Sequence, residues 1–189
     1  MDITYQIKFY NDWHCGSGLA AGADVDLLVI KDKNNLPFVP GKTMKGLLRE
    51  AATDIICFRK EDEKLLDSLF GKRSTTEKDE LQNGCLYFSN ATLDKNIASA
   101  ISANSMSEQL YRSLSSTAID ADGIAKDKSL RRMQVTVPCE LYGEIKHIPE
   151  ENIHLIEEAL HYIKRLGQNR NRGLGRCDVI VKEKKGGEK

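Results

Sequence analysis

The sequence predicts a mixed α+β fold, and two kinds of hydrophobic spacing along the chain are the main evidence. In residues 3–9 apolar and polar side chains alternate, which is typical of a strand with one buried face. In residues 43–56 apolar side chains instead recur every three or four positions, which predicts an amphipathic helix. Along the chain, the predicted elements follow one another as strand, helix, strand, strand, helix, strand. That order is typical of the ferredoxin-like (RRM-like) βαββαβ fold, an antiparallel four-stranded sheet with two helices on one face.

In the first half of the chain, the first strand leads into a long loop insertion. This loop covers residues 10–24 and is followed by a short extended segment at 26–31. Pro40 and Gly41 then mark the start of the first helix. A second, shorter helix is predicted over residues 63–70.

The middle of the chain is predicted to carry a projecting excursion between the second and third strands. Those strands are expected at residues 85–93 and 133–145. Residues 94–115 are rich in Ser, Ala and Asn, and no periodicity assigns them to an element. Residues 116–133 contain an Asp-Gly turn signal between short extended arms, which predicts a hairpin-like arm. The excursion as a whole therefore spans about residues 94–133.

The last part of the chain predicts a helix, a loop and a strand. The helix opens at Pro149, a position in the first turn that suits proline, and it is expected to stop at Gly167. A glycine- and arginine-rich loop follows over residues 167–176, and the final strand is expected over 177–181. The charged tail, residues 182–189, is expected to be frayed.

Length and charge indicate one globular domain, residues 1–189, without a global signature of nucleic-acid binding. Lys plus Arg and Asp plus Glu each number 28, so the formal net charge is zero. The local charge is nevertheless uneven. Residues 31–49 contain five basic side chains and one acid, and residues 167–176 contain three arginines and no acid. A binding surface for an anion would be expected in these two segments.

The cysteines and the hydropathy pattern indicate a cytoplasmic protein. The five cysteines are odd in number and widely spaced, and without a CxxC pair a zinc site is not expected. We expect free thiols in a reducing compartment. No signal peptide opens the sequence and no apolar run approaches the ~18 residues of a membrane span, so no membrane contact is predicted.

The Gly41-Lys42-Thr43 sequence at the start of the first helix raises the question of a nucleotide-binding P-loop. A Walker A motif requires a glycine five residues before Gly41, and that position is Leu36, so no nucleotide cofactor is expected. The helix start can still bind a backbone phosphate, because its first amides are free and the helix dipole favours anions. The alternative is a solvated basic face. Three basic side chains would reinforce phosphate binding: Lys42, Lys45 and Arg49.

The glycine- and arginine-rich loop at residues 167–176 is the second candidate phosphate site. Glycine lets the backbone approach a ligand closely, and arginine offers forked donors to phosphate. The alternative is a simple turn between a helix and an edge strand. The candidate binding residues are Asn169, Arg170, Asn171, Arg172, Gly173 and Gly175.

Asp24 and Asp26 are the candidate acids for chemistry. They are two residues apart, so in an extended segment they would lie on the same face. Paired acids near a phosphate can bind a divalent ion or orient an attacking hydroxyl. The alternative is an ordinary loop end, where aspartate is common. His14 is a lone histidine beside Trp13, and no Ser/His/Asp or Cys/His constellation can be placed around it.

Three groups of residues resemble motifs of one known family. The first is the glycine loop at 13–18, with the segments 26–30 and 36–46 that follow it. The second is residues 118–131 and the third is the loop 167–175. In this order, they resemble the RAMP superfamily of CRISPR systems, and most closely the Cas7 backbone subunits of type III effector complexes, of the Csm3 and Cmr4 kind. The resemblance covers most of the chain.

The resemblance implies an RNA-guided function. Copies of the subunit would stack along a guide crRNA, and the second motif would be a thumb that kinks the guide–target duplex. The complex would cleave complementary target RNA at intervals of about six nucleotides. The family's catalytic acid falls on Asp26, which would also bind Mg²⁺ or another divalent cation, with Asp24 as its neighbour. The implied RNA-binding residues are His14, Gly16, Ser17, Gly18, Gly41, Lys42, Thr43, Lys45, Arg49, Arg131, Arg132, Asn169, Arg170, Asn171, Arg172, Gly173 and Gly175.

The same resemblance implies partners and leaves alternatives open. Besides crRNA, target RNA and further copies of the chain, the partners would be a Cas5-like subunit, Cas10 or another nuclease, and a small subunit. One alternative is a Cas7 scaffold that does not cleave and relies on a partner nuclease. Another is a Cas6-like guide-processing RNase, but such enzymes usually contain two ferredoxin-like units and this chain has room for one. Another ferredoxin-like RNA-binding protein is the third.

Overall fold

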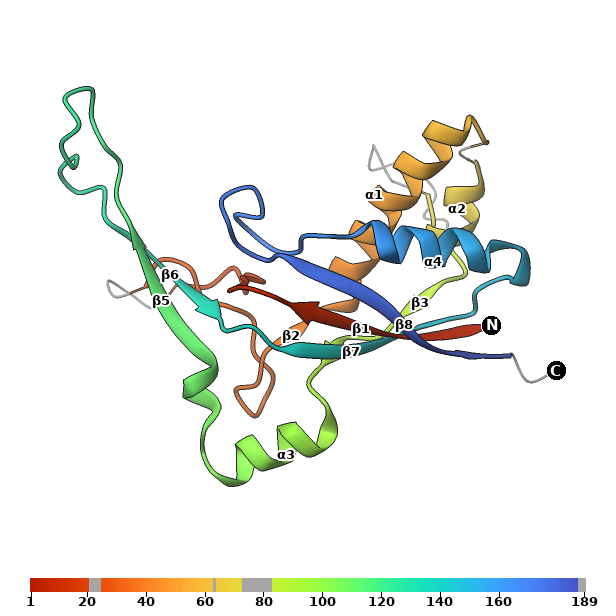
Figure 1. Ribbon diagram of the computed structural model, residues 1–189, viewed down its shortest axis with the longest axis horizontal. Helices are drawn as coiled ribbons and strands as arrows, with labels where there is room; N and C mark the ends of the chain where they lie inside the picture. The colour runs from red at the N-terminus through yellow and green to blue at the C-terminus, as the bar shows by residue number, and fades with distance from the viewer. Residues whose placement is uncertain (21–24, 63, 73–82, 187–189) are drawn as a thin grey trace.

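The computed structural model describes residues 1–20, 25–62, 64–72 and 83–186, and its architecture is mixed α+β. An antiparallel sheet forms the centre, with strand order β2-β4-β7-β1-β8 and with β3 paired to β7 (Figure 1). The α+β class and the antiparallel sheet confirm the prediction and are consistent with a ferredoxin-like fold. The strands of this sheet are β1 (Asp2–Phe9), β2 (Phe38–Val39), β3 (Tyr87–Phe88), β4 (Ala91–Thr92), β7 (Glu140–Lys146) and β8 (Cys177–Lys185).

β1 is an interior strand of the sheet, and it pairs with both β7 and β8. Ile3 lies opposite Ile145 and Ile7 lies opposite Leu141, and all four side chains are completely buried. The apolar positions of the alternating pattern therefore face the core. Because side chains alternate between the two faces of a strand, this register places the polar positions on the opposite face.

Helices α1 (Gly41–Arg59) and α4 (Ile153–Tyr162) contact each other and lie on the same side of the sheet (Figure 1). α1 extends beyond the predicted range of 43–56 at both ends, and the shorter α2 (Lys64–Phe70) packs against it. No helix in the described part of the chain is long and apolar enough to span a membrane. The side chains that α1 buries are Met44, Leu48, Ala51, Ala52, Ile55 and Ile56.

The predicted continuation of α4 to Gly167 is wrong, because the helix ends at Tyr162. The chain beyond it runs alongside the start of β8. The amide of Cys177 donates to the carbonyl oxygen of Lys164 at 3.0 Å, and the backbones of Arg165 and Arg176 form an antiparallel β-bridge. These pairings replace the helical hydrogen bonds and bring the two ends of the glycine loop together.

The segment predicted as one strand at 85–93 consists of β3 and β4, which are separated by Ser89 and Asn90. The hydroxyl of Ser89 accepts a hydrogen bond from the amide of Glu144 at 2.8 Å. The side chain of Asn90 accepts one from the amide of Gly41 at 2.9 Å. The break in the strand therefore supplies a cap for the start of α1.

The long strand predicted at 133–145 is also two strands. The first is β6 (Arg131–Thr136), and the second is β7, which belongs to the central sheet. Pro138 lies between them, and proline cannot donate a ladder hydrogen bond. At the end of the chain, β8 continues to Lys185, and beyond a β-bulge at Lys182 its residues 183–185 pair with β1 rather than being frayed as predicted.

The unassigned stretch 94–115 contains a helix, a short 3-10 turn and a strand. These are α3 (Lys95–Ala103), η1 (Ser107–Leu110) and β5 (Tyr111–Ser116). β5 pairs with β6 in a separate two-stranded sheet, the β5–β6 hairpin, which extends away from the central sheet (Figure 1). The hairpin therefore spans residues 111–136 and is longer than the arm predicted at 116–133.

Three contacts attach the base of the β5–β6 hairpin to the body. Trp13 and Thr136 exchange backbone hydrogen bonds at 3.0 and 2.8 Å. Nε of Arg112 donates to Oδ2 of Asp12 at 2.6 Å. The ammonium group of Lys31 lies 3.8 Å from the centre of the Tyr111 ring, a cation–π geometry. The position of the hairpin base is therefore fixed relative to the loop that follows β1.

Candidate functional site

A cavity of about 660 Å³ lies between the outer half of the β5–β6 hairpin, the segment at Asp26 and the glycine loop. We call it the Asp26 cavity. It brings Asp26 together with four predicted RNA-binding residues that lie more than one hundred positions away in the sequence. These four are Arg131, Arg132, Asn169 and Arg172.

Asp26 is held beside the outer half of the β5–β6 hairpin, toward its tip, by backbone pairing with β6. The amide of Asp26 donates to the carbonyl oxygen of Arg132 at 2.9 Å, and the amide of Gln134 donates to that of Leu27 at 2.9 Å. In addition, the amide of Arg132 donates to Oδ2 of the Asp26 side chain at 2.7 Å. One carboxylate oxygen is thus oriented by the hairpin, which leaves Oδ1 as the oxygen to contact a ligand.

The Asp26 cavity offers oxygen ligands of the kind that Mg²⁺ prefers, but Asp26 is the only carboxylate among the described residues that line it. Among the described residues no group of three His, Cys, Asp or Glu side chains could hold a metal ion, and Asp24 lies outside the described residues. Mg²⁺ is commonly bound by one or two carboxylates, with water and substrate phosphate completing its shell. Asp26 fits that type of site, in which the metal arrives with the phosphate.

A second cavity, of about 330 Å³, lies between the loop after β1 and the start of α1. We call it the His14 cavity. Pro40, Lys42 and Thr43 line this cavity, so the positive end of α1 faces it, and no acid in the first turn of the helix offsets that charge. The predicted residues that line this cavity are His14, Gly16, Ser17, Lys42, Thr43 and Arg170.

His14 is fully buried at the edge of this cavity. Its Nδ1 lies 2.6 Å from the carbonyl oxygen of Gln134 in β6. Burial lowers the pKa of the imidazole, and the hydrogen bond to Gln134 opposes that shift only in part. His14 is therefore neutral at physiological pH.

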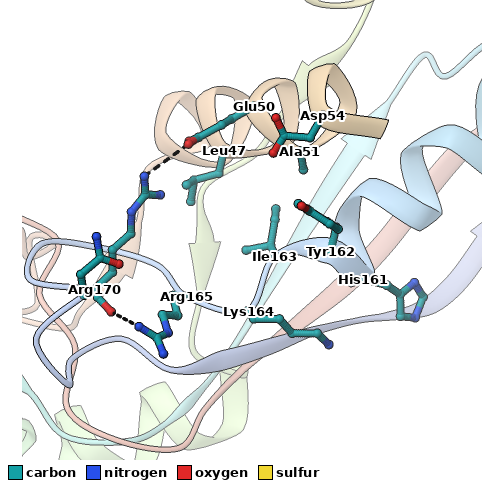
Figure 2. A pocket seen from close by; sticks show the side chains of 11 residues that line it. Leu47, Glu50, Ala51, Asp54, His161, Tyr162, Ile163, Lys164, Arg165 and Arg170 are labelled. Atoms are coloured by element: carbon teal, nitrogen blue, oxygen red, sulfur yellow. Dashed lines mark hydrogen bonds and ion pairs between the residues drawn. The ribbon is translucent and has the colours of Figure 1, made fainter. Parts of the chain in front are cut away.

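Arg170 also lines a third hollow, of about 710 Å³, between α1 and residues 161–171 (Figure 2). Figure 2 shows the Arg170 guanidinium pointing toward Glu50, with Nη2 at 3.3 Å from the carboxylate oxygen. The backbone oxygen of Arg170 accepts a hydrogen bond from Arg165 at 2.9 Å. Both contacts are exposed, so they orient Arg170 without preventing it from turning toward a phosphate.

Several other predicted residues lie outside the Asp26 and His14 cavities. Arg49 faces α2, where it pairs with Asp67 at 2.8 Å and donates to the carbonyl oxygen of Gly71. The amide of Gly41 is engaged by Asn90, and a side chain at this position would collide with the backbone of Phe88. Asn171 lines the third hollow. The remaining residues outside both cavities are Gly18, Lys45, Gly173 and Gly175.

Gly175 is required by the geometry of the glycine loop. Its φ is +68°, and a Cβ there would lie 1.9 Å from the carbonyl oxygen of Leu166. Its amide donates to the carbonyl oxygen of Asp12 at 2.7 Å, which ties the loop to the segment after β1. Gly173 also has a positive φ, of +88°, but nothing lies within 4 Å of a Cβ at that position.

We expect Gly175→Ala to lower the free energy of unfolding by about 3 kcal/mol or more, because it combines a backbone clash with a left-handed conformation. The matched control Gly173→Ala should cost only about 1 kcal/mol, since it meets the conformational penalty alone. Chemical denaturation of both variants measures the difference. Equal losses would mean that the contact between Gly175 and Leu166 is not tight in solution.

Sequence reasoning missed several residues that line the two cavities. Gln168 lines both of them, and its position inside the glycine loop was a signal that could have identified it. Leu114, Ser115 and Ser116 line the Asp26 cavity, but they lie in or next to the segment that showed no periodicity. The other missed side chains of the Asp26 cavity are apolar: Leu27, Met133 and Leu174.

Comparisons with known proteins identify the family of the chain. Two solved structures share its fold, "Cryo-EM structure of the Type III-B Cmr-beta bound to cognate target RNA" and "Type III-B Cmr-beta Cryo-EM structure of the Apo state". The first aligns with a TM-score of 0.72 at 10% identity, and the second with 0.71 at 11%; both cover 96% of this chain and 97% of the other. A search of curated proteins finds no significant match. The family model described as "RAMP superfamily" matches residues 6–178, and the chain therefore belongs to the RAMP superfamily.

Proposed function

We propose that this chain is a guide-RNA-binding, Cas7-like backbone subunit of a type III CRISPR ribonucleoprotein. Several copies line up along the crRNA, and each cleaves complementary target RNA, at intervals of about six nucleotides. The observation that carries this proposal is the Asp26 cavity, where a carboxylate oriented by the hairpin lies beside three arginines, Arg131, Arg132 and Arg172. Membership of the RAMP superfamily and the fold shared with type III-B Cmr-beta chains support it.

In the proposed reaction, Asp26 takes the proton of a target 2′-hydroxyl, and the 2′-oxygen attacks the adjacent phosphorus. The bond from phosphorus to the 5′-oxygen breaks, the leaving oxygen takes a proton from water, and the products carry a 2′,3′-cyclic phosphate and a 5′-hydroxyl. The arginines of the cavity stabilise the negative charge that develops on the phosphate. A divalent cation bound by Asp26 and the phosphate would supply further charge stabilisation.

The rest of the chain has proposed roles in assembly. The β5–β6 hairpin, on a ferredoxin-like βαββαβ core, is the thumb that kinks the guide–target duplex. The His14 cavity holds guide phosphates through the start of α1, Lys42 and Arg170. Partners in the cytoplasm would be a Cas5-like subunit, Cas10 or another nuclease, and a small subunit.

A scaffold subunit that does not cleave is the second candidate function. It is favoured by the isolation of Asp26, which is the only acid that lines its cavity in the described part of the chain. The test is a gel of end-labelled target RNA incubated in Mg²⁺ with the chain assembled on a matched guide. A ladder with a spacing of about six nucleotides is expected. An intact target that stays bound would leave only the scaffold function.

Guide binding is tested separately from cleavage. Combined substitution of four basic residues by alanine should weaken guide affinity. Lys42 and Arg170 line the His14 cavity, Arg172 lines the Asp26 cavity, and Lys45 follows Lys42 by about one turn of α1, so together they form the proposed phosphate track. The slope of log affinity against log salt concentration should fall by about 0.7 for each lost phosphate contact. A variant that replaces four lysines outside both cavities serves as the control and should retain most of the affinity. An unchanged affinity and slope in the first variant would contradict the phosphate track. The test positions are Lys42, Lys45, Arg170 and Arg172, and the control positions are Lys64, Lys95, Lys182 and Lys185.

A further inference from the structure

The hydrogen bonding of His14 defines which of its ring nitrogens can accept a proton. Nδ1 lies 2.6 Å from the carbonyl oxygen of Gln134, and a carbonyl oxygen only accepts hydrogen bonds. Nδ1 therefore carries the ring hydrogen. In the neutral imidazole Nε2 then carries no hydrogen and is an acceptor.

Nε2 of His14 is buried and has no hydrogen-bond partner among the described residues. A buried polar atom without a partner is uncommon in native proteins, because it loses its hydrogen bond to water without replacement. Among the described residues, five other side chains also have a buried polar atom without a hydrogen-bond partner: Tyr5, Asp12, Trp13, Gln134 and Thr136. His14 alone among the six lines one of the cavities described above.

Gly16 keeps the approach from the cavity to Nε2 free of a side chain. A Cβ at position 16 would lie 3.2 Å from Nε2 and 3.5 Å from the side-chain nitrogen of Gln168. Any larger residue at this position would cover the imidazole. Gln168 is exposed, so its side chain can move aside when a ligand enters.

The rest of the cavity wall indicates the chemistry of that ligand. Lys42, Arg170 and the start of α1 favour an anion, whereas Nε2 requires a hydrogen-bond donor. A phosphate oxygen satisfies the first requirement, but without a hydrogen it cannot satisfy the second. A ribonucleotide satisfies both, since its 2′-hydroxyl is a donor and lies on the carbon next to the one that bears the 3′-phosphate.

We propose that the His14 cavity binds one ribonucleotide unit of the guide, whose 2′-hydroxyl donates a hydrogen bond to Nε2 of His14. This inference rests on the proposed guide binding and extends it, because it makes His14 the residue that distinguishes ribose from deoxyribose. Deoxyribose offers only a C–H group at this position and would leave Nε2 buried without a partner. The lowered pKa of the imidazole supports the role, since a protonated ring could not accept the bond.

The test uses the full chain assembled on a synthetic guide RNA in which single 2′-deoxy substitutions are moved along the sequence. Substitution at the positions that occupy His14 cavities should lower guide affinity by about tenfold, which corresponds to one lost buried hydrogen bond. Substitution at other positions should have a smaller effect. The sensitive positions should recur with the spacing of the subunits.

A variant of the protein separates His14 from other contacts to the sugar. In His14→Phe, which keeps a planar ring and removes the acceptor, all-RNA guides and guides with deoxy substitutions at the sensitive positions should bind equally. Gln168→Ala should preserve the tenfold difference. Loss of the difference in Gln168→Ala would overturn the proposal, because Gln168 would then be the group that recognises the hydroxyl.

The outcomes distinguish the inference from the proposed function. Strong guide binding without any deoxy-sensitive position would overturn the role of His14 and leave guide binding intact. Failure of every guide to bind would overturn the proposed function itself. If His14→Phe does not fold, as judged by its thermal unfolding, the deoxy scan on the wild-type chain still decides the question.

Discussion

Asp26→Asn is expected to lower the rate of target RNA cleavage by at least about a hundredfold while the guide remains bound, because proton transfer by a positioned side chain contributes that much or more. The asparagine side chain keeps an oxygen that can accept the hydrogen bond from the amide of Arg132, so the attachment of this segment to β6 should be preserved. It loses the negative charge that would take a proton and bind a cation. Single-turnover cleavage of labelled target in Mg²⁺ measures the effect.

Two further variants make this result specific. Asp26→Ala removes both the charge and the acceptor, so it should abolish cleavage and also loosen the attachment of this segment to β6, detected by faster hydrogen exchange in β6. Asp54→Asn removes a carboxylate from α1, in the third hollow, and should cleave like wild type. Cleavage at the wild-type rate by Asp26→Asn would exclude Asp26 as the proton acceptor and would mean that another group performs the reaction.

Arg112→Ala is expected to produce a large loss of stability at the hairpin base. The side chain of Asp12 is only 7% exposed, and Arg112 holds its Oδ2. Removal of the arginine leaves a buried carboxylate without its partner, which is the costly way to break such a pair. Because the Arg112 side chain is 58% exposed, we expect a loss of about 2 kcal/mol in the free energy of unfolding rather than the larger cost of a fully buried pair.

The order of effects among related variants tests this explanation. Asp12→Ala leaves an arginine that water can solvate, so it should cost less than Arg112→Ala. The double variant should be close to Asp12→Ala, because the unpaired carboxylate is gone. Chemical denaturation gives the three values. An additive double variant would show that the two residues do not interact in solution.

The parts of the fold that were predicted correctly have strong local periodicity. The alternation in β1 and the helical spacing in α1 both reflect rows of side chains that face the core. By contrast, no residue of α3 is fully buried, and only Ala98 and Ile101 pack against the core, which is too short a row to stand out in the sequence. The break between β6 and β7 at Pro138 was visible in the sequence, but the apolar residues on both sides favoured one continuous strand.

The candidate site was predictable as a set of residues but not as an arrangement. Asp26, Arg132 and Arg172 each lie in a segment with suggestive chemistry, and the structure brings them to one cavity. The hydrogen bond between Asp26 and Arg132 joins residues 106 positions apart, and no local pattern encodes such a contact. The pairing of Arg49 with Asp67 was hidden for the same reason, since α2 packs against α1 only in the folded chain.

The attachment of Asp26 to β6 has a consequence for how the length of the chain can vary. Residues 117–130 lie beyond the paired strands of the hairpin, so insertions or deletions there leave the contacts between Asp26 and β6 unchanged. A deletion of one residue inside β6 would instead shift every later side chain to the opposite face. It would also remove Arg132 from its place opposite Asp26. Among members of the superfamily with an acid at the position of Asp26, hairpin tips should therefore differ freely in length, while the spacing from Arg132 to Thr136 should stay constant.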